Sequence, residues 1–395
     1  MRILTVSATP YLITRLGRIN SDIIRYLKSQ GHVVGSAVWQ HDRSWFLTDD
    51  KGISNFIFRG EKICDLYVFS NSPQTASPQV YEIMKRFQPD IVISIGDYDE
   101  TDFIYAIKRL YPDFFKWIAI LTIDAYPVNE KHKDAINAMD VAICTNMMGY
   151  KAIKCISPIK CEYVRYGPDD IFKKTHDKDN SGLRVMSCAK NSQSANPASF
   201  ILGVSDAIKI RNDITGYLHT NLYDPGDYDI RLLINRYGKI ELPKKFVGLN
   251  DGITDEDLAK EYCKSDVFVD VPARSSTGLS ILESMSCGCI PVGNNVGAVG
   301  EILSLMPEKY RFIASSYGFM GANEEIYQVV SWKELAVILA NISVTKYESP
   351  EIIDEIRKSA IEVAAKFSKK IFLEKLKEMI TFSLQLNKVI VVESF

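Results

Sequence analysis

Residues 267–303 constrain the fold of this chain more than any other stretch. They read VFVDVPARSSTGLSILESMSCGCIPVGNNVGAVGEIL. A β-branched and aromatic run at 267–271 is followed by a small-residue loop, a helical segment that ends at Gly288, a second apolar strand and a glycine-rich loop into another helix. This order of strand, loop and helix, repeated once, predicts a parallel sheet with ligand-binding loops at the carboxyl ends of its strands.

One carboxylate stands out in this stretch, because Glu283 is the only charged residue between Arg274 and Glu301. A carboxylate on a helix between two apolar strands is costly unless a polar group meets it. The preceding Thr277-Gly278-Leu279 presents backbone N–H groups at a helix N-terminus, where the helix dipole favours phosphate. An anion site followed by a carboxylate that accepts hydrogen bonds from a diol predicts a site for a nucleoside diphosphate.

Composition limits the class of protein. The 395 residues predict two domains at roughly 100–200 residues each, and a formal net charge of −2 gives no overall field to attract nucleic acid or an anionic membrane. The eight cysteines lack paired C-x-x-C spacing, which indicates reduced core residues. No signal peptide precedes the first strand, and no apolar run reaches the ~20 residues of a membrane span. We therefore expect a soluble, cytoplasmic α/β protein.

Strand and helix patterns alternate along the first part of the chain, and this alternation predicts a doubly wound parallel sheet. The strands are expected at 2–8, 32–39, 91–95, 117–123, 141–144 and 161–165. The polar, apolar-poor segment at 169–183 is typical of a linker. A second sheet is expected to begin at residue 184.

Residues 275–292 read SSTGLSILESMSCGCIPV and resemble the donor motif E-G-F-G-L-x-x-L-E-A-M-A-x-G-x-P-V of GT-B glycosyltransferases of retaining family 4. The loop at 221–229 resembles that of archaeal-type members. The resemblance spans most of the chain and is strongest over 215–303. It implies transfer of a hexosyl or pentosyl group from a UDP- or GDP-sugar with retention of configuration, and no essential metal.

The resemblance also implies a domain layout of two Rossmann-like sheets that face a central cleft. An acceptor domain at 1–170 is joined by a linker at 171–183 to a donor domain at 184–368. A final helix at 369–395 is expected to pack back on the first domain.

The resemblance implies roles for single residues on the donor side. Glu283 matches the family glutamate that holds the nucleotide ribose, whereas the glutamate that contacts the donor sugar is Ser275 here. The basic pair that neutralises the diphosphate falls on Ala195 and Asn196 in a gap-free alignment. Lys190 is therefore the candidate cation, with a plain surface lysine as the alternative role and Arg274 as a second candidate for the phosphate. The remaining donor-side candidates are Asn191, Leu249, Asn250, Arg274, Thr277, Gly278 and Leu279.

Acidic and basic residues after strands complete the candidate set. Asp97 and Asp124 each follow a strand, where a helix cap is the alternative role. Asp124 is the nearest match to a family histidine beside the donor sugar, so Asp124, Lys190 and Glu283 are the catalytic candidates. The loop at 9–17 and the start of the helix at 18–30 carry Arg15, Gly17 and Arg18, which we expect on the acceptor side; solvated charge is the alternative.

Other functions stay open beside glycosyl transfer. An epimerase or phosphorylase on the same scaffold is one, although the acid and base groups it needs are not apparent. A degenerate protein that binds nucleotide or a partner is another, because Ser275, Ala195 and Asn196 depart from the family pattern. The acceptor is expected to be a saccharide or glycoconjugate. A modest basic and aromatic cluster keeps open a modified nucleic acid base as acceptor: Lys151, Lys154, Lys160, Arg165, Tyr150, Tyr163 and Tyr166.

Overall fold

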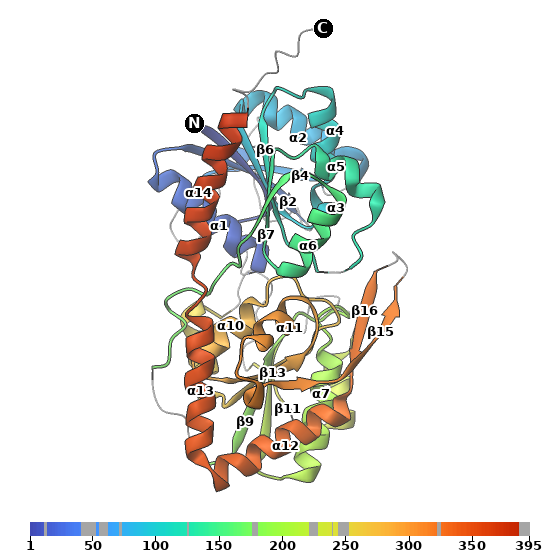
Figure 1. Cartoon of the computed structure of the whole chain (residues 1–395), viewed down its shortest axis with the longest axis vertical. Coiled ribbons are helices and arrows are strands. Elements are labelled where there is room, and N and C mark those ends of the chain that lie inside the picture. Colours follow the sequence, from blue (N-terminus) through green and yellow to red (C-terminus); the bar gives the residue numbers. More distant parts are fainter. Residues whose placement is uncertain are drawn as a thin grey trace. The chain divides into compact units, whose positions relative to one another are not determined.

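A computed structural model describes residues 1–11, 14–40, 53–54, 62–70, 73–124, 126–175, 181–220, 228–238, 240–243, 253–321 and 325–386. Contacts divide the chain into two compact units (Figure 1). Unit 1 comprises Met1–Ile123, Val128–Val164 and Lys370–Phe395, and unit 2 comprises Asp124–Pro127 and Arg165–Lys369. The described part of 171–183 belongs to unit 2 by its contacts, and the final helix belongs to unit 1.

Unit 1 is built on an eight-stranded sheet in the order β3-β4-β2-β1-β5-β6-β7-β8. The strand pairs are parallel except for β3 with β4. The strands are β1 (Arg2–Ala8), β2 (Val33–Gln40), β3 (Ile53–Ser54), β4 (Asp65–Ser70), β5 (Ile91–Gly96), β6 (Lys116–Leu121), β7 (Val141–Cys144) and β8 (Lys160–Tyr163). The helices are α1 (Arg15–Ser29), α2 (Pro73–Phe87), α3 (Tyr98–Thr101), α4 (Phe103–Leu110), α5 (Lys133–Asn137), α6 (Met147–Ile156) and α14 (Lys369–Gln385).

The start of α1 corrects one expectation. We predicted a loop as far as Gly17, but the helix begins at Arg15 because Thr14 caps it: the Thr14 hydroxyl accepts a hydrogen bond from the Gly17 N–H at 3.3 Å. Such a cap satisfies one of the free N–H groups of the first turn. Arg15, Gly17 and Arg18 therefore lie in the first turn of a helix, after the carboxyl end of β1.

Unit 2 is built on a six-stranded parallel sheet in the order β11-β10-β9-β12-β13-β14. The strands are β9 (Leu183–Cys188), β10 (Ile214–His219), β11 (Ile240–Glu241), β12 (Val267–Asp270), β13 (Ile290–Asn294) and β14 (Phe312–Ala314). The helices are α7 (Pro197–Ile210), α8 (Ile230–Tyr237), α9 (Asp255–Lys264), α10 (Leu279–Ser286), α11 (Gly297–Ser304), α12 (Trp332–Glu348) and α13 (Pro350–Ala364). The strand order reverses between β9 and β12, and ligands of open α/β sheets bind at such a switch point.

A short hairpin, which the sequence did not lead us to expect, adds to unit 2. Its strands are β15 (Ser316–Met320) and β16 (Ile326–Val330), which pair in antiparallel fashion. The outer edge of β16 is held by two backbone hydrogen bonds, from Ile326 to the Tyr126 carbonyl and from Gln328 to the Ala273 carbonyl, both 3.0 Å long. The hairpin thus fastens the segment 124–127 to the loop that follows β12.

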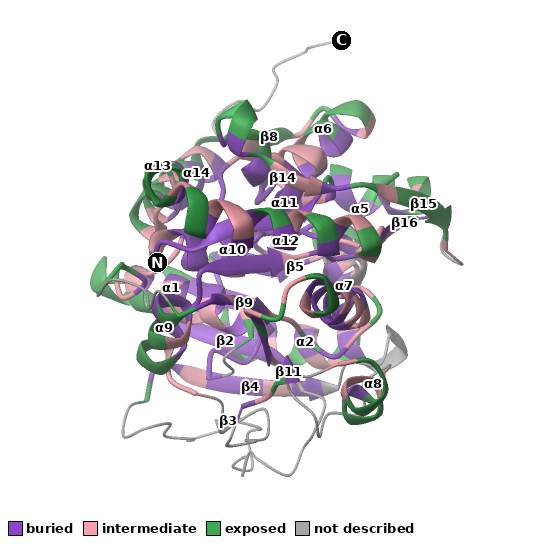
Figure 2. Ribbon diagram, turned by 90° about the horizontal axis from the view of Figure 1, so that it is seen from below, coloured by how far each residue is buried: buried purple, intermediate pink, exposed green. Residues whose placement is uncertain are grey.

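Burial explains why the strands form parallel sheets. Figure 2 shows strands such as β2, β5 and β9 in purple, while helices such as α8 and α13 turn exposed faces outward. Strands covered on both faces need nearly continuous apolar sequence, as β5 (IVISIG) has. The predicted fold class is confirmed for each sheet. Among the described helices, none has the length and apolar character that a membrane crossing needs.

Candidate functional site

Four neighbouring strands of unit 2 end in polar residues around the switch point. Thr220 follows β10, Asn191 follows β9, and Asp270 and Asn294 are the last residues of β12 and β13. The Thr220 Oγ1, Asn191 Oδ1 and Asn294 Oδ1 atoms are buried and have no hydrogen-bond partner among the residues that the structure describes. Buried polar atoms are nearly always paired, so unpaired ones indicate a polar ligand or water at this edge. Sequence reasoning missed Thr220, Asp270 and Asn294; a polar residue that ends a buried strand is the signal for them.

Asp270 has an unusual environment for a carboxylate. It is half-buried, and its side chain forms no hydrogen bond or ion pair within the described part of the chain. Burial disfavours the charged form and raises the pKa of Asp270 to about 7. A carboxylic acid that is partly protonated at neutral pH therefore stands directly before the loop 271–278.

The loop 271–278 is held through its carbonyl groups. Each of five carbonyl oxygens accepts a hydrogen bond from a donor outside the loop. The pairs are Val271 with Asn196 Nδ2 (3.2 Å), Pro272 with Asn294 Nδ2 (2.9 Å), Ala273 with Gln328 N (3.0 Å), Ser275 with Ala298 N (3.1 Å) and Thr277 with Arg165 Nη1 (3.0 Å). In a trans peptide the N–H of the next residue points opposite to the carbonyl. Fixing the Thr277 carbonyl therefore fixes the direction of the Gly278 N–H.

The end of this loop has the features of an anion site. Gly278 precedes α10 with a left-handed backbone (φ 60°) and caps the helix without a side-chain hydrogen bond. The Gly278 and Leu279 N–H groups have no acceptor among the described residues. Free N–H groups at a helix start favour phosphate. The phosphate role that the sequence predicted for residues 277–279 stays a prediction, and the free N–H groups of Gly278 and Leu279 are the observation in its favour.

Gly297 lets the loop 271–278 pack against the start of α11. Its backbone is left-handed (φ 44°), and a Cβ atom there would lie 2.1 Å from the Ser275 carbonyl oxygen. We expect Gly297→Ala to lower the free energy of unfolding by about 2–4 kcal/mol, because backbone strain adds to a steric clash. Gly31→Ala is the matched control, since Gly31 has φ 82° and a Cβ atom added there would meet nothing within 4 Å. Equal losses of the free energy of unfolding in Gly297→Ala and Gly31→Ala, measured by urea unfolding, would contradict the steric clash.

Glu283 lies on α10 with only 2% of its surface exposed. Its Oε2 accepts a hydrogen bond from the Tyr262 hydroxyl at 3.3 Å. The Tyr262 ring is held in turn by Phe268 and Phe172, whose ring centroids lie 5.4 and 6.0 Å away. A buried carboxylate in a rigid aromatic environment keeps a fixed orientation, and specific binding of a ligand requires such a fixed side chain.

Arg274 is brought together with two carboxylates. Its Nη1 lies 2.5 Å from Glu325 Oε2 and 3.6 Å from Asp124 Oδ1, and its guanidinium lies 4.6 Å from the centre of the Tyr327 ring. The structure thus unites Asp124 and Arg274, both sequence candidates, and adds Glu325, which sequence reasoning missed. With two anionic partners, the guanidinium carries less net positive field toward a phosphate than a lone arginine.

The loop after β9 keeps one exposed cation. Lys190 is exposed and takes part in no ion pair among the residues the structure describes. Asn191 donates to the Tyr228 carbonyl at 2.8 Å. Asn196, where the family pattern has a basic residue, instead donates to the Val271 carbonyl; it stands at the N-cap position of α7 without a side-chain capping hydrogen bond. Leu249 and Asn250, the nucleobase candidates, lie outside the described residues.

Asp97, an acceptor-side candidate in unit 1, caps a helix. It caps α3 with a complete capping box in which the Glu100 carboxylate accepts a hydrogen bond from the Asp97 N–H at 2.8 Å. A helix cap is the alternative role that the sequence analysis gave for Asp97. Its predicted contact with the sugar acceptor stays a prediction. In the basic cluster, Lys160 is paired with Glu162, while the Arg165 side chain is only 1% exposed. These two residues therefore offer little free charge to nucleic acid.

Comparison with known proteins identifies the fold. No protein-family model matches the sequence, and no curated protein does. Solved structures match almost the whole chain. Sucrose-phosphate synthase from Thermosynechococcus elongatus superposes with a TM-score of 0.73 at 13% identity, covering 97% of this chain and 99% of that one. This chain has the GT-B fold. Its fold neighbours include an E. coli structure titled as trehalose-6-phosphate bound with UDP-2-fluoro glucose (TM-score 0.70, 13% identity, 99% and 100% covered).

A third neighbour with the GT-B fold is the pneumococcal O-GlcNAc transferase GtfA in complex with UDP and GlcNAc. It has a TM-score of 0.63 at 10% identity, with 97% of this chain and 99% of that one covered. At such low identity the likeness establishes the fold alone, and the resemblance to family 4 rests on the sequence motif.

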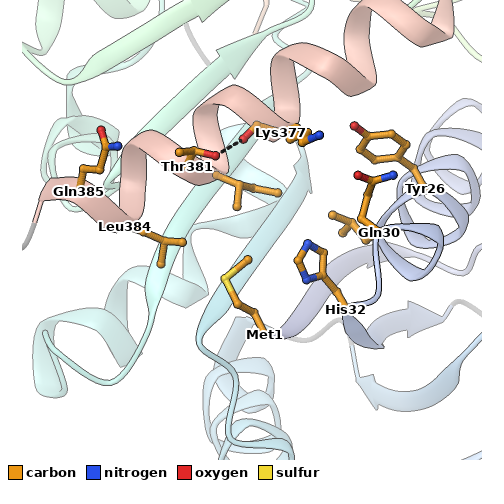
Figure 3. Close-up of a pocket in the computed structure, with 10 residues that line it drawn as sticks. Met1, Tyr26, Gln30, His32, Lys377, Thr381, Leu384 and Gln385 are labelled. Carbon is orange, nitrogen blue, oxygen red and sulfur yellow. Dashed lines mark hydrogen bonds between the residues drawn. The ribbon is translucent and has the colours of Figure 1, made fainter.

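A pocket in unit 1 lies apart from the predicted site residues (Figure 3). It has a volume of about 470 Å³ and lies between α14 and the end of α1, with Lys377 and Thr381 on one side and Tyr26 and His32 on the other. Met1 lines it too, which places it at the amino end of β1. Ligand loops of α/β sheets lie at the opposite, carboxyl end. None of the sequence-predicted site residues lines this pocket.

Proposed function

We propose that this chain is a glycosyltransferase whose unit 2 binds a nucleoside-diphosphate sugar. The observation that carries the proposal is the loop 271–278. Five of its carbonyl groups accept hydrogen bonds from other parts of unit 2, which leaves the Gly278 and Leu279 N–H groups able to donate to an anion. The buried Glu283 follows on the same helix. A diphosphate and a ribose diol fit these two groups. Two fold neighbours are titled with UDP or a UDP sugar, in keeping with such a donor.

We assign the donor-side roles as follows. Gly278, Leu279 and Thr277 hold the phosphate, Glu283 accepts hydrogen bonds from the ribose hydroxyls, and Lys190 offsets diphosphate charge beside Asn191. Leu249 and Asn250 are the predicted contacts of the base. Asp124, Arg274 and Ser275 are assigned to the donor sugar, with Glu325 orienting Arg274. UDP- and GDP-sugars are the expected donors.

The chemistry is a substitution at the anomeric carbon of a hexosyl or pentosyl group. The bond from that carbon to the diphosphate oxygen breaks, a bond to an acceptor hydroxyl oxygen forms, and the acceptor proton is released. Leaving-group stabilisation and positioning supply most of the rate in such sites. The family 4 resemblance favours retention of configuration without an essential metal. A saccharide or glycoconjugate is the expected acceptor, with Arg15, Gly17, Arg18 and Asp97 as its candidate contacts.

A thermal-shift panel of UDP-, GDP-, ADP- and dTDP-sugars tests the proposal. Ligand binding to the folded state raises stability in proportion to the logarithm of ligand concentration over Kd. We expect one nucleotide series to raise the melting temperature at sub-millimolar concentration. No shift with any of the four series would contradict the proposed donor site.

A binding-only protein is the second candidate. The replacement of the basic pair by Ala195 and Asn196, together with the two carboxylates on Arg274, favours it. Donor hydrolysis without acceptor separates the two functions, because a transferase leaks slowly to water whereas a binder releases intact nucleotide sugar. Chromatography of the donor after prolonged incubation reports either outcome.

Lys190→Ala tests the assigned cation. Removing one ammonium from a diphosphate site is expected to raise the Kd for UDP or GDP about five- to tenfold. Because the lost term is ionic, the affinity of the variant should also fall less steeply with salt. The control is Lys209→Ala, a 70% exposed lysine on α7. Equal affinities of the two variants in isothermal titration would remove Lys190 from the site.

A further inference from the structure

Arg165 lies buried within unit 2 and is bonded to the candidate anion loop. Its side chain is only 1% exposed, its Nη1 donates to the Thr277 carbonyl at 3.0 Å, and its Nη2 pairs with the Glu301 carboxylate. The Phe367 ring lies 5.6 Å from the guanidinium. A buried guanidinium costs several kcal/mol unless it is hydrogen-bonded, and the bonds at Nη1 and Nη2 determine the position of this one.

The peptide between Thr277 and Gly278 needs such a donor. Gly278 has φ 60°, and glycine adopts positive and negative φ with similar ease, so the residue by itself does not fix this peptide plane. A rotation of the plane would turn the Thr277 carbonyl toward the anion and the Gly278 N–H away from it. Among the five tied carbonyls of the loop, only that of Thr277 accepts from a charged side chain.

Glu301 explains why Arg165 acts through the loop and not on the anion. Its carboxylate, on α11, neutralises the guanidinium, and the side chains of both residues are largely covered (1% and 24% exposed). The proposed contact with the nucleotide is therefore made by the backbone N–H groups of Gly278 and Leu279.

We propose that Arg165 is a positioning residue of the donor site: it locks the Thr277–Gly278 peptide so that the Gly278 N–H faces the diphosphate. The inference rests on the proposed function, since it assigns that N–H a phosphate oxygen. In this proposal Arg165 acts through the Thr277 carbonyl, without a contact to donor or acceptor. It belongs to no part of the donor motif and stands more than a hundred residues before the loop in sequence.

The chain offers a control in Arg184, whose side chain makes the same kinds of contact but is 22% exposed and also donates to the Ser265 hydroxyl at 2.6 Å. This arginine also donates to a carbonyl (Glu261, 3.2 Å), pairs with a carboxylate (Glu261, 2.8 Å) and stacks on a ring (Tyr217, 4.6 Å). It lies at the start of β9, at the edge of the sheet opposite to the loop 271–278. Substitutions at the two positions therefore disturb similar interactions, and only one of them touches the anion loop.

The experiment compares Arg165→Met and Arg165→Lys with Arg184→Met and Arg184→Lys. Urea unfolding measures stability, isothermal titration measures UDP and GDP affinity, and the ¹⁵N-resolved Gly278 amide resonance reports the peptide plane. We expect a stability loss at both positions, larger at the more deeply buried Arg165, but a UDP or GDP affinity about tenfold or more lower only for Arg165→Met, because only there is the lost charge-assisted hydrogen bond one to the anion loop. Arg165→Lys should recover part of it, and the Gly278 resonance should move in the Arg165 variants alone.

Two results would overturn the inference. If the wild-type chain binds nucleotide and the Arg165 and Arg184 variants lose affinity equally, Arg165 is merely structural and the inference is overturned, while the proposed function stands. If Arg165→Met does not fold, the same comparison is made with the two lysine variants. If the wild-type chain binds neither UDP nor GDP, the proposed function falls and the inference falls with it.

Discussion

Replacement of Glu283 by alanine is expected to abolish the stabilisation of this chain by its nucleotide sugar. The carboxylate would accept two hydrogen bonds from a ribose diol, and bonds to a charged acceptor contribute about 1.5–3 kcal/mol each. Losing both should weaken binding by more than a hundredfold. A thermal-shift titration that is saturable for the wild-type chain should be flat for Glu283→Ala at the same ligand concentrations.

Two further variants show whether the effect is due to the ligand. Glu283→Gln keeps the shape but removes the charge, so it should retain weak binding. Tyr262→Phe removes the hydroxyl that orients the carboxylate from 3.3 Å and should reduce affinity only several-fold. In the absence of ligand, Glu283→Ala removes the hydrogen bond from the buried Tyr262 hydroxyl but also removes a buried charge, so the free energy of unfolding should change by only about 1–3 kcal/mol. An undiminished ligand shift in Glu283→Ala would remove the ribose assignment.

The two sheets and the burial of Glu283 could be predicted from the sequence for the same physical reason. Strands buried on both faces need continuous apolar residues, so β5 and β12 stand out, and a lone charge among them must be buried and must meet a polar group. Neither inference requires knowledge of which distant residues meet. The helix cap at Thr254, whose hydroxyl accepts a hydrogen bond from the Asp257 N–H at 3.2 Å, depends on equally local features, because a threonine before an acidic first turn is typical of a helix start.

The partners of charged residues could not be predicted, because they depend on contacts between distant segments. Arg274 looked like a free phosphate ligand in the sequence, yet Asp124 and Glu325, distant from it along the chain, pair with it in space. Arg165 looked like one member of a basic surface cluster, but its side chain is buried against the anion loop.

The proximity of Thr220 and Asn294 could not be predicted from the sequence either. Their buried Oγ1 and Oδ1 atoms have no hydrogen-bond partner within the described part of the chain. Each is an ordinary polar residue in sequence, and only the order of the strands brings them to the same edge around the switch point. The hairpin β15–β16 was missed because its strands, SYGFM and IYQVV, bury almost no side chain: no residue of β15 is buried, and only Val330 is buried in β16. Without a clear alternation, a pattern of period two does not emerge.

Replacement of Asp270 by asparagine is expected to change the pH dependence of stability. Burial raises the pKa of Asp270 in the folded chain to about 7, whereas an unfolded aspartate titrates near pH 3.9. Between these values the folded state binds more protons than the unfolded state, so the free energy of unfolding falls as pH rises from about 4 to about 7 and levels off above. Asparagine has no such proton and lacks this loss.

The wild-type chain should therefore lose about 2–4 kcal/mol relative to Asp270→Asn between pH 4.5 and pH 8, the lower figure allowing for the partial exposure of the carboxylate. Urea unfolding across this range measures the difference directly, and other titrating groups cancel in it. Asp354→Asn, at a 75% exposed carboxylate, is the control and should follow the wild-type curve closely. Parallel curves for wild type and Asp270→Asn would mean that the carboxylate is well solvated. Because Asp270 directly precedes the loop 271–278, its ionisation should also repel a diphosphate, so nucleotide affinity should decline through pH 7 in the wild type and not in Asp270→Asn.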